Sequence, residues 1–113
     1  MIGGNTEVVI QVKTASEKNE IGERISTWTE AKKLKGFLDL MSGNANYTSF
    51  NTKIAESTNI FICDWQDLST VDVEKARMLI NNSIYDITFI DDPMGLHDHL
   101  EIFLKNKGGL NAN

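Results

Sequence analysis

Two segments in the second half of the chain alternate apolar and polar residues with a period of two. In the first segment, Tyr85, Ile87 and Phe89 share one face, and Asp86 and Thr88 occupy the other. In the second, residues 100–104 read Leu-Glu-Ile-Phe-Leu. Because successive side chains of a strand point to opposite faces, this alternation predicts half-buried antiparallel strands. The Asn-Asn-Ser sequence at 81–83 tolerates left-handed backbone, which predicts a tight turn before the first of them.

The rest of the chain carries further strand-like segments separated by polar residues. We expect strands over 6–14, 24–30, 33–41, 58–64 and 77–80, and a hairpin loop over 15–23. Gly36 lies in the middle of one strand, where a glycine often marks a bulge or a bend. A short helix within 65–76 would begin at Ser69 or Thr70, which are good N-cap residues. The pattern predicts a mainly β fold, either a barrel or a sandwich, with at most one or two short helices.

Size and charge exclude several classes of protein. A chain of 113 residues is enough for one domain, which we assign to 1–113 with flexible termini at 1–5 and 106–113. A net charge of −5 disfavours tight binding to nucleic-acid phosphates. The single cysteine, Cys63, rules out an intramolecular disulfide and suggests synthesis in a reducing cytoplasm. No apolar run approaches the roughly 18 residues that cross a bilayer, so no membrane association is expected.

A long polar segment, 42–56, separates two of the predicted strands. Its apolar residues are the isolated Tyr47, Phe50 and Ile54, at a spacing that fits a surface loop with anchors or one or two helical turns. Loops beyond about 12–15 residues are uncommon in compact domains and are often functional. The segment is therefore the first place to look for a functional role.

Candidate chemical groups are few. His97 and His99 lie two apart, so on a strand they share a face. A metal site needs three or four ligands; Asp91 and Asp92 could contribute oxygen, but no other His or Cys cluster completes the site. Cys63 lies in the most apolar strand, where a thiol is usually inert. We therefore expect no catalytic residue, no metal site and no cofactor, and an interaction or assembly module rather than an enzyme.

The order of features along residues 6–105 resembles the head–tail joining proteins of long-tailed bacteriophages, also called head-completion or stopper proteins. Each feature alone is common, but their order and spacing in a chain of this length are more specific. The segments that carry the resemblance are Ser26–Trp28, Lys35–Gly43, Ile54–Ile62, Arg77–Ile80, Tyr85–Ile87 and Leu100–Leu104.

The resemblance implies a small antiparallel β-barrel that forms a homo-oligomeric ring in the virion neck after assembly in the host cytoplasm. The ring would lie below the portal and adaptor, face a tail-completion or tail-terminator protein, and surround packaged double-stranded DNA without reading its sequence. A loop from each copy would enter the channel and help retain the DNA; residues 42–56 match it, and Lys53 is its only charged residue before Glu56. The implied channel-loop residues are Ser42, Gly43, Asn44, Asn46, Tyr47, Thr48, Phe50, Asn51, Lys53 and Ile54, and the implied inter-subunit anchors are Tyr47, Phe50 and Trp65.

Three alternatives remain beside this interpretation. A tail-completion or tail-terminator protein of the same particle would carry more helix. A small barrel that binds single-stranded nucleic acid would interleave aromatic and basic residues, whereas Tyr85 and Phe89 alternate with Asp86 and Thr88. An enzyme would have to use His97 and His99 without evident partners. The barrel core expected from alternation is Val8, Ile10, Leu38, Leu40, Ile60, Ile62, Tyr85, Ile87, Phe89, Leu100, Ile102 and Leu104.

Overall fold

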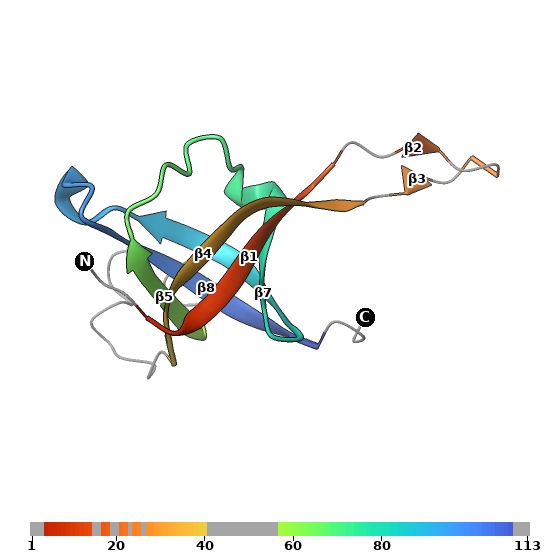
Figure 1. Cartoon of the computed structure of the whole chain (residues 1–113). Helices are drawn as coiled ribbons and strands as arrows, with labels where there is room; N and C mark the ends of the chain where they lie inside the picture. Colours follow the sequence, from red (N-terminus) through yellow and green to blue (C-terminus); the bar gives the residue numbers. More distant parts are fainter. Residues whose placement is uncertain are drawn as a thin grey trace.

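Six strands close into an antiparallel barrel in a computed structural model of the chain, in the order β1–β4–β5–β8–β7–β6 (Figure 1). The structure describes residues 4–14, 17–18, 21–22, 24–25, 27–40 and 57–109. This confirms the predicted mainly β barrel. The strands are β1 (Thr6–Lys13), β4 (Trp28–Leu40), β5 (Asn59–Asp64), β6 (Ala76–Ile80), β7 (Ser83–Asp91) and β8 (His99–Gly109).

The helical content of the described residues is two short 3-10 turns, η2 (Val73–Lys75) and η3 (Pro93–Gly95). The helix expected within 65–76 is thus only η2, and its cap is Asp72, whose carboxylate accepts a hydrogen bond from the Glu74 amide at 3.1 Å. The predicted caps Ser69 and Thr70 were wrong. No described helix is long and apolar enough to span a membrane.

The two strands predicted over 24–30 and 33–41 are instead one 13-residue strand, β4, preceded by the short β3 (Arg24–Ile25). A bulge does interrupt the β1–β4 ladder, but it lies between Ile10 and Gln11 and not at Gly36. Gly36 is needed for another reason: a Cβ placed there would lie 2.2 Å from the Ile62 carbonyl oxygen. The strands β4 and β5 therefore approach each other at a distance that only glycine permits.

We expect Gly36→Ala to lower the free energy of unfolding by about 1–3 kcal/mol, the usual cost of overpacking. The added methyl meets backbone on β5, which cannot move aside as a flexible side chain would. Gly109→Ala is the matched control, because its Cβ would lie 3.6 Å from the nearest atom, an ordinary contact. Urea unfolding of both variants tests this, and equal midpoints would show that the Gly36 contact is not tight.

The barrel interior is filled by the inward-facing side chains of all six strands. Seven of the predicted core residues are buried: Val8, Ile10, Tyr85, Ile87, Leu100, Ile102 and Leu104. Leu38 is half-buried against this core. The predicted set also missed several fully buried side chains, among them Phe61, Cys63 and Met78.

Four predicted core positions were wrong. In β5 the faces are exchanged: Phe61 is inside, while Ile60 and Ile62 face outward and are half-buried. Leu40, at the end of β4, is 76% exposed. Phe89 follows a bulge between Ile87 and Phe89, which turns it outward so that Ile90 packs on the core instead.

The C-terminal strand is longer than expected. Residues 106–109 belong to β8, where Gly108 pairs with Ile84 and Gly109 with Ser83. The expectation that fraying begins at residue 106 is therefore wrong for these four residues. Asn81 adopts the left-handed backbone, φ 48°, that the Asn-Asn-Ser turn was predicted to need.

An arm extends from the barrel where the β1–β4 ladder continues into β2 (Glu17–Lys18) and β3. Figure 1 shows this two-stranded ribbon standing away from the barrel. At its base, the Arg77 guanidinium lies 4.1 Å from the centroid of the Trp28 ring and its Nε donates to Gln11 Oε1 at 2.8 Å. These contacts tie the base of the arm to β6.

Candidate functional site

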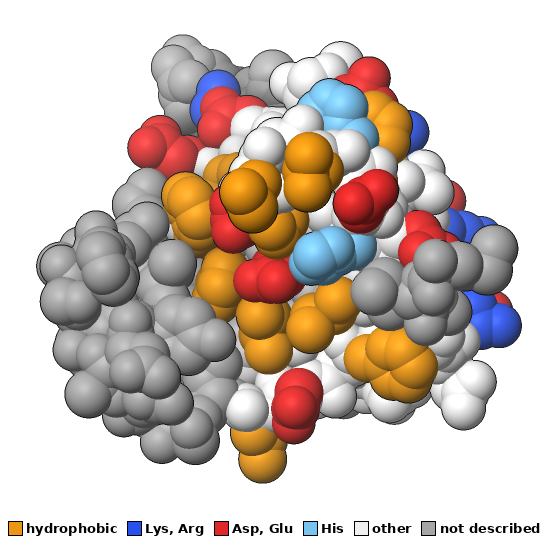
Figure 2. All heavy atoms as spheres, turned by 90° about the vertical axis from the view of Figure 1, so that its left-hand side faces the viewer, with side chains coloured by type: hydrophobic (Ala, Val, Ile, Leu, Met, Phe, Trp, Pro, Cys, Tyr) orange, Lys and Arg blue, Asp and Glu red, His pale blue; other side chains and the backbone are white. Residues whose placement is uncertain are grey.

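The predicted channel-loop residues, from Ser42 to Ile54, lie outside the described residues. Their role, and that of Tyr47 and Phe50 as inter-subunit anchors, stays a prediction. Trp65 is described: it follows β5 directly, is half-buried and packs against the core cluster. Trp65 lies within a surface on which exposed apolar and acidic side chains gather (Figure 2).

Trp65 joins two segments at the end of the barrel opposite the arm. Its ring lies 4.6 Å from the His97 ring, centroid to centroid, with 31° between the planes. Its backbone amide donates to the Asp98 carbonyl at 3.3 Å. The segment after β5 is therefore held against the turn between β7 and β8. We call residues 64–68 and 91–99 together the end face.

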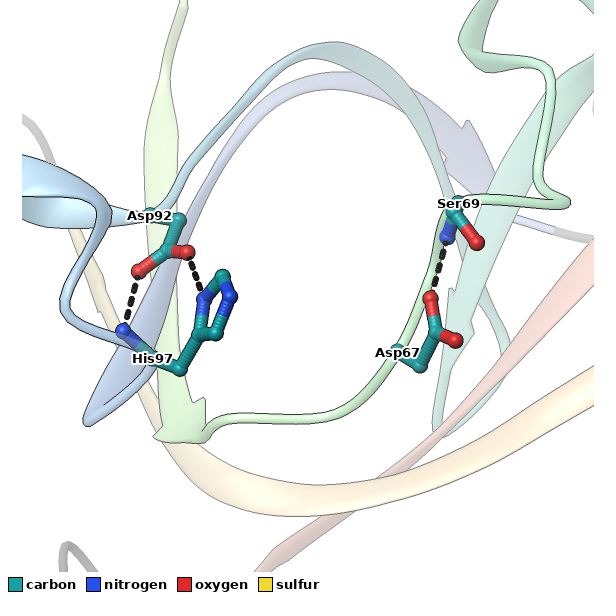
Figure 3. A network of polar contacts seen from close by, with 4 residues as sticks. All are labelled: Asp67, Ser69, Asp92 and His97. Atoms are coloured by element: carbon teal, nitrogen blue, oxygen red, sulfur yellow. Dashed lines mark hydrogen bonds and ion pairs between the residues drawn. The ribbon is translucent and has the colours of Figure 1, made fainter.

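Asp92 fixes the turn between β7 and β8. Its Oδ1 accepts a hydrogen bond from the His97 amide at 3.0 Å, and its Oδ2 pairs with His97 Nδ1 (Figure 3). On the other side of the end face, Asp67 accepts a hydrogen bond from the Ser69 amide at 3.0 Å. Hydrogen bonds from the side chain and backbone of Ser69 lower the pKa of the Asp67 carboxyl. Both carboxylates thus serve to hold loop backbone.

The turn fixed by Asp92 presents two apolar side chains to solvent. Met94 is 91% exposed and Leu96 is 62% exposed. Met94 and His97 adopt left-handed backbone, with φ of 57° and 58°, which costs roughly 1–2 kcal/mol for an ordinary residue. The contacts of Asp92 and Trp65 with His97 maintain this conformation, so the two side chains are displayed on a constrained turn. We call Pro93–Leu96 the display turn.

The end face is apolar and acidic. Figure 2 shows apolar side chains gathered among acidic residues and both histidines, with lysine and arginine only at the margins of this view. Trp65, Leu68, Ile90 and His97 line an open groove of about 650 Å³ beside the display turn. A surface of this kind, with exposed apolar residues among polar ones, is typical of a protein–protein contact.

The two histidines are engaged separately. His97 pairs with Asp92, and His99 Nε2 lies 3.1 Å from Glu101 Oε2. Within the described ranges, no three or more His, Cys, Asp or Glu side chains are placed to hold a metal ion. The His97–Asp92 pair holds the turn between β7 and β8, and the His99–Glu101 pair lies within β8. The described residues therefore add no metal ligands that would support the alternative of an enzyme using His97 and His99.

Cys63 faces the barrel interior, where its side chain is 1% exposed. Burial, and then the nearby Asp64 charge, raise the pKa of its thiol to about 11. Because a buried thiol favours the protonated form, this contribution to stability is present below the ordinary thiol pKa and is lost as the pH rises toward 11.

We therefore expect iodoacetamide at about pH 8 to alkylate Cys63 far more slowly in the folded chain than in urea, since the thiolate is the reactive form. Mass spectrometry of timed samples measures both rates. Similar rates with and without urea would contradict the burial and the raised pKa.

Comparison with known proteins places this geometry in a family. The family model of the phage head completion protein matches residues 4–107. The solution structure of protein SF1141 from Shigella flexneri 2a is similar with a TM-score of 0.67, at 15% sequence identity over 95% of this chain and 96% of that chain, which shows the shared fold alone. No curated protein matches the sequence. The family match covers the whole described barrel up to residue 107, and the chain therefore belongs to the phage head completion protein family.

Proposed function

We propose that this chain forms a ring in the phage neck, below the portal and adaptor, where it helps retain packaged DNA and provides the surface to which the tail attaches. The observation that carries the proposal is the family match over residues 4–107. The family is one of structural virion proteins, and membership of it supports a structural role for this chain. The ring, the DNA retention and the tail attachment are the proposed part.

The closed barrel supports a role in side-by-side assembly. Closure leaves the barrel without a free edge strand, so further copies cannot join by adding strands to it. Contacts between copies must then use side chains and projecting elements. The structure supplies both: the display turn with Met94 and Leu96 at one end, and the arm, where Ile21 is 77% exposed, at the other.

The charge of the chain agrees with a channel that holds DNA without gripping it. The net charge is −5, and the end face carries several acidic side chains. A protein that neutralises phosphates with lysine and arginine binds DNA tightly and releases it only as salt rises. DNA in a virion must leave through the neck, so retention by steric restriction in residues 42–56 fits this charge better than electrostatic binding.

The tail-completion alternative is less well supported. It predicts helix packed against the sheet, and the described residues contain only η2 and η3. A circular dichroism spectrum of the whole chain showing more than about a third helix, the average for globular domains, would favour that alternative.

Gold labelling tests the proposed place of the chain. Antibodies against the chain, applied to purified tailed particles and to heads released from tails, should mark the junction between head and tail. Labelling should be stronger on tail-free heads, where the lower surface of the ring is uncovered. Label at the distal tip of the tail, or absent from intact and disrupted particles alike, would contradict the proposal.

A further inference from the structure

A second surface on the same chain is complementary to the display turn. It is a groove of about 660 Å³ on the outer wall of the barrel, over β1, β4 and β6. Val9 of β1 is opposite Leu79 of β6 on one side and Lys33 of β4 on the other. Two apolar residues and one basic residue therefore lie side by side across the three strands. Glu7 and Lys35 are opposite each other in the β1–β4 ladder, and the exposed Lys33 lies 3.9 Å from Glu30. We call this the wall groove; within the described residues it has an apolar floor, two lysines and one acid, Glu7.

The display turn has the opposite character. Its exposed side chains are Met94 and Leu96, and the carboxylates that flank it are Asp91, Asp92 and Asp98. Asp92 is engaged with His97; of the other two acids, Asp98 is exposed and Asp91, the last residue of β7, is half-buried. An apolar protrusion with acids beside it matches an apolar groove with lysines beside it, and such charge complementarity selects partner and orientation.

The two surfaces lie at opposite ends of β7. The wall groove is bounded by Asn81 and Asn82, which precede β7, and the display turn follows Asp91, its last residue. A strand of this length spans roughly 30 Å. Lys33 and Lys35 border Asp64 and Gln66 of the end face. The apolar floor is farther away, because Leu79 pairs with Ile84 near the start of β7 and Val9 pairs with Leu79. The display turn therefore does not reach the apolar floor of its own chain. Joined between molecules, they form a heterologous contact, which is repeated from copy to copy and closes into a ring when the rotation allows.

We infer that the wall groove of each copy receives the display turn of the next copy, with Met94 and Leu96 over Val9 and Leu79 and with Lys33 and Lys35 toward the flanking aspartates. The inference rests on the ring proposed above and identifies the contact between its neighbouring copies. The constrained turn suits this role, because backbone that is already held in position loses little freedom on binding.

Sedimentation velocity of the full chain, from micromolar to millimolar concentrations, tests the contact with two variants. The turn variant carries Met94→Asp and Leu96→Asp, and the groove variant carries Lys33→Glu and Lys35→Glu. Each should weaken self-association at least about tenfold, since a carboxylate placed in an apolar contact or opposite other carboxylates opposes association by more than the roughly 1.4 kcal/mol that this factor requires. Lys75→Glu with Lys105→Glu is the matched control, because both lysines are exposed and neither lines the wall groove; it should associate as the parent does. Circular dichroism confirms that all variants are folded.

Mixing the two variants gives the most specific result. The turn variant retains an intact groove and the groove variant retains an intact turn, so one contact can still form between them. The mixture should yield dimers that grow no further, whereas each variant alone stays monomeric.

Several outcomes would overturn the inference: a parent chain that stays monomeric at millimolar concentration, a parent that stops at a symmetric dimer, or oligomers that survive both variants. Survival of oligomers in both variants would mean that the copies of the ring meet through another surface, such as the arm. Failure of the proposed head-completion role would be detected by a different experiment, the gold labelling, as label that is absent from the junction between head and tail.

Discussion

Replacing Ile102 with alanine is expected to lower the free energy of unfolding by about 2–5 kcal/mol, the usual range for such a truncation in a core. Ile102 is 0% exposed and lies at the centre of the barrel. It pairs with Phe61 on β5 and with Ile90 on β7, so the cavity would open between three strands. Because a domain of this size is stable by only about 5–15 kcal/mol, this is a large fraction of the total.

Urea unfolding monitored by circular dichroism measures the effect of Ile102→Ala. Lys105→Ala, an exposed change on the same strand, is the control and should alter stability by no more than about 0.5 kcal/mol. If Ile102→Ala unfolded at the same urea concentration as the parent and the control, the inward face of β8 would be wrongly assigned.

Deleting residues 44–53 is expected to leave the barrel folded and to abolish the retention of DNA or the attachment of tails. The barrel should tolerate the deletion because Leu40 and Asn59, which flank the segment, are paired neighbours on β4 and β5. Paired residues of antiparallel strands lie only about 4.5–5.5 Å apart, so the residues that remain are enough to connect them. The particles should package DNA, because packaging precedes the step at which the ring acts, and then lose it.

A variant with the same number of residues distinguishes the effect of the segment's length from the effect of its apolar side chains. In it, Tyr47, Phe50 and Ile54 become serine and the number of residues is unchanged. We expect this variant to leak DNA as the deletion does, because ordering the backbone costs about 1–2 kcal/mol per residue and these side chains are the ones able to offset it in the ring. DNA retention and tail attachment at parental levels in both variants would show that the segment is a plain surface connection.

The strands with regular alternation could be predicted from the sequence, and those without it could not. Tyr85 and Ile87 alternate with Asp86 and Thr88, so the burial of one face followed from polarity alone. In β5, Ile60, Phe61 and Ile62 are all apolar, and the choice of inward face depends on pairing with β4 and β8. Phe89 faces outward because of a bulge between Ile87 and Phe89, and no residue type in the sequence predicts that bulge.

The end face was only partly predictable. The resemblance implied Trp65 as an inter-subunit anchor; in the structure it packs on the core of its own chain, and its contact with a neighbouring copy stays a prediction. In the sequence, Asp92 was considered as a possible metal ligand, which does not predict the display of Met94. Methionine has no preference for left-handed backbone, so its conformation follows from the Asp92–His97 contacts across five residues.

Adding the purified chain back to heads that lack it tests the central claim most directly. Heads are assembled and packaged by the phage with the gene for this chain disrupted, and are then incubated with the chain and with purified tails. DNA protected from nuclease and the number of infectious particles are measured with and without the chain. We expect heads without the chain to package DNA but lose it and to bind no tails. The chain should correct both defects, and the form lacking residues 44–53 should correct neither. Heads that keep their DNA and join tails without the chain would contradict it.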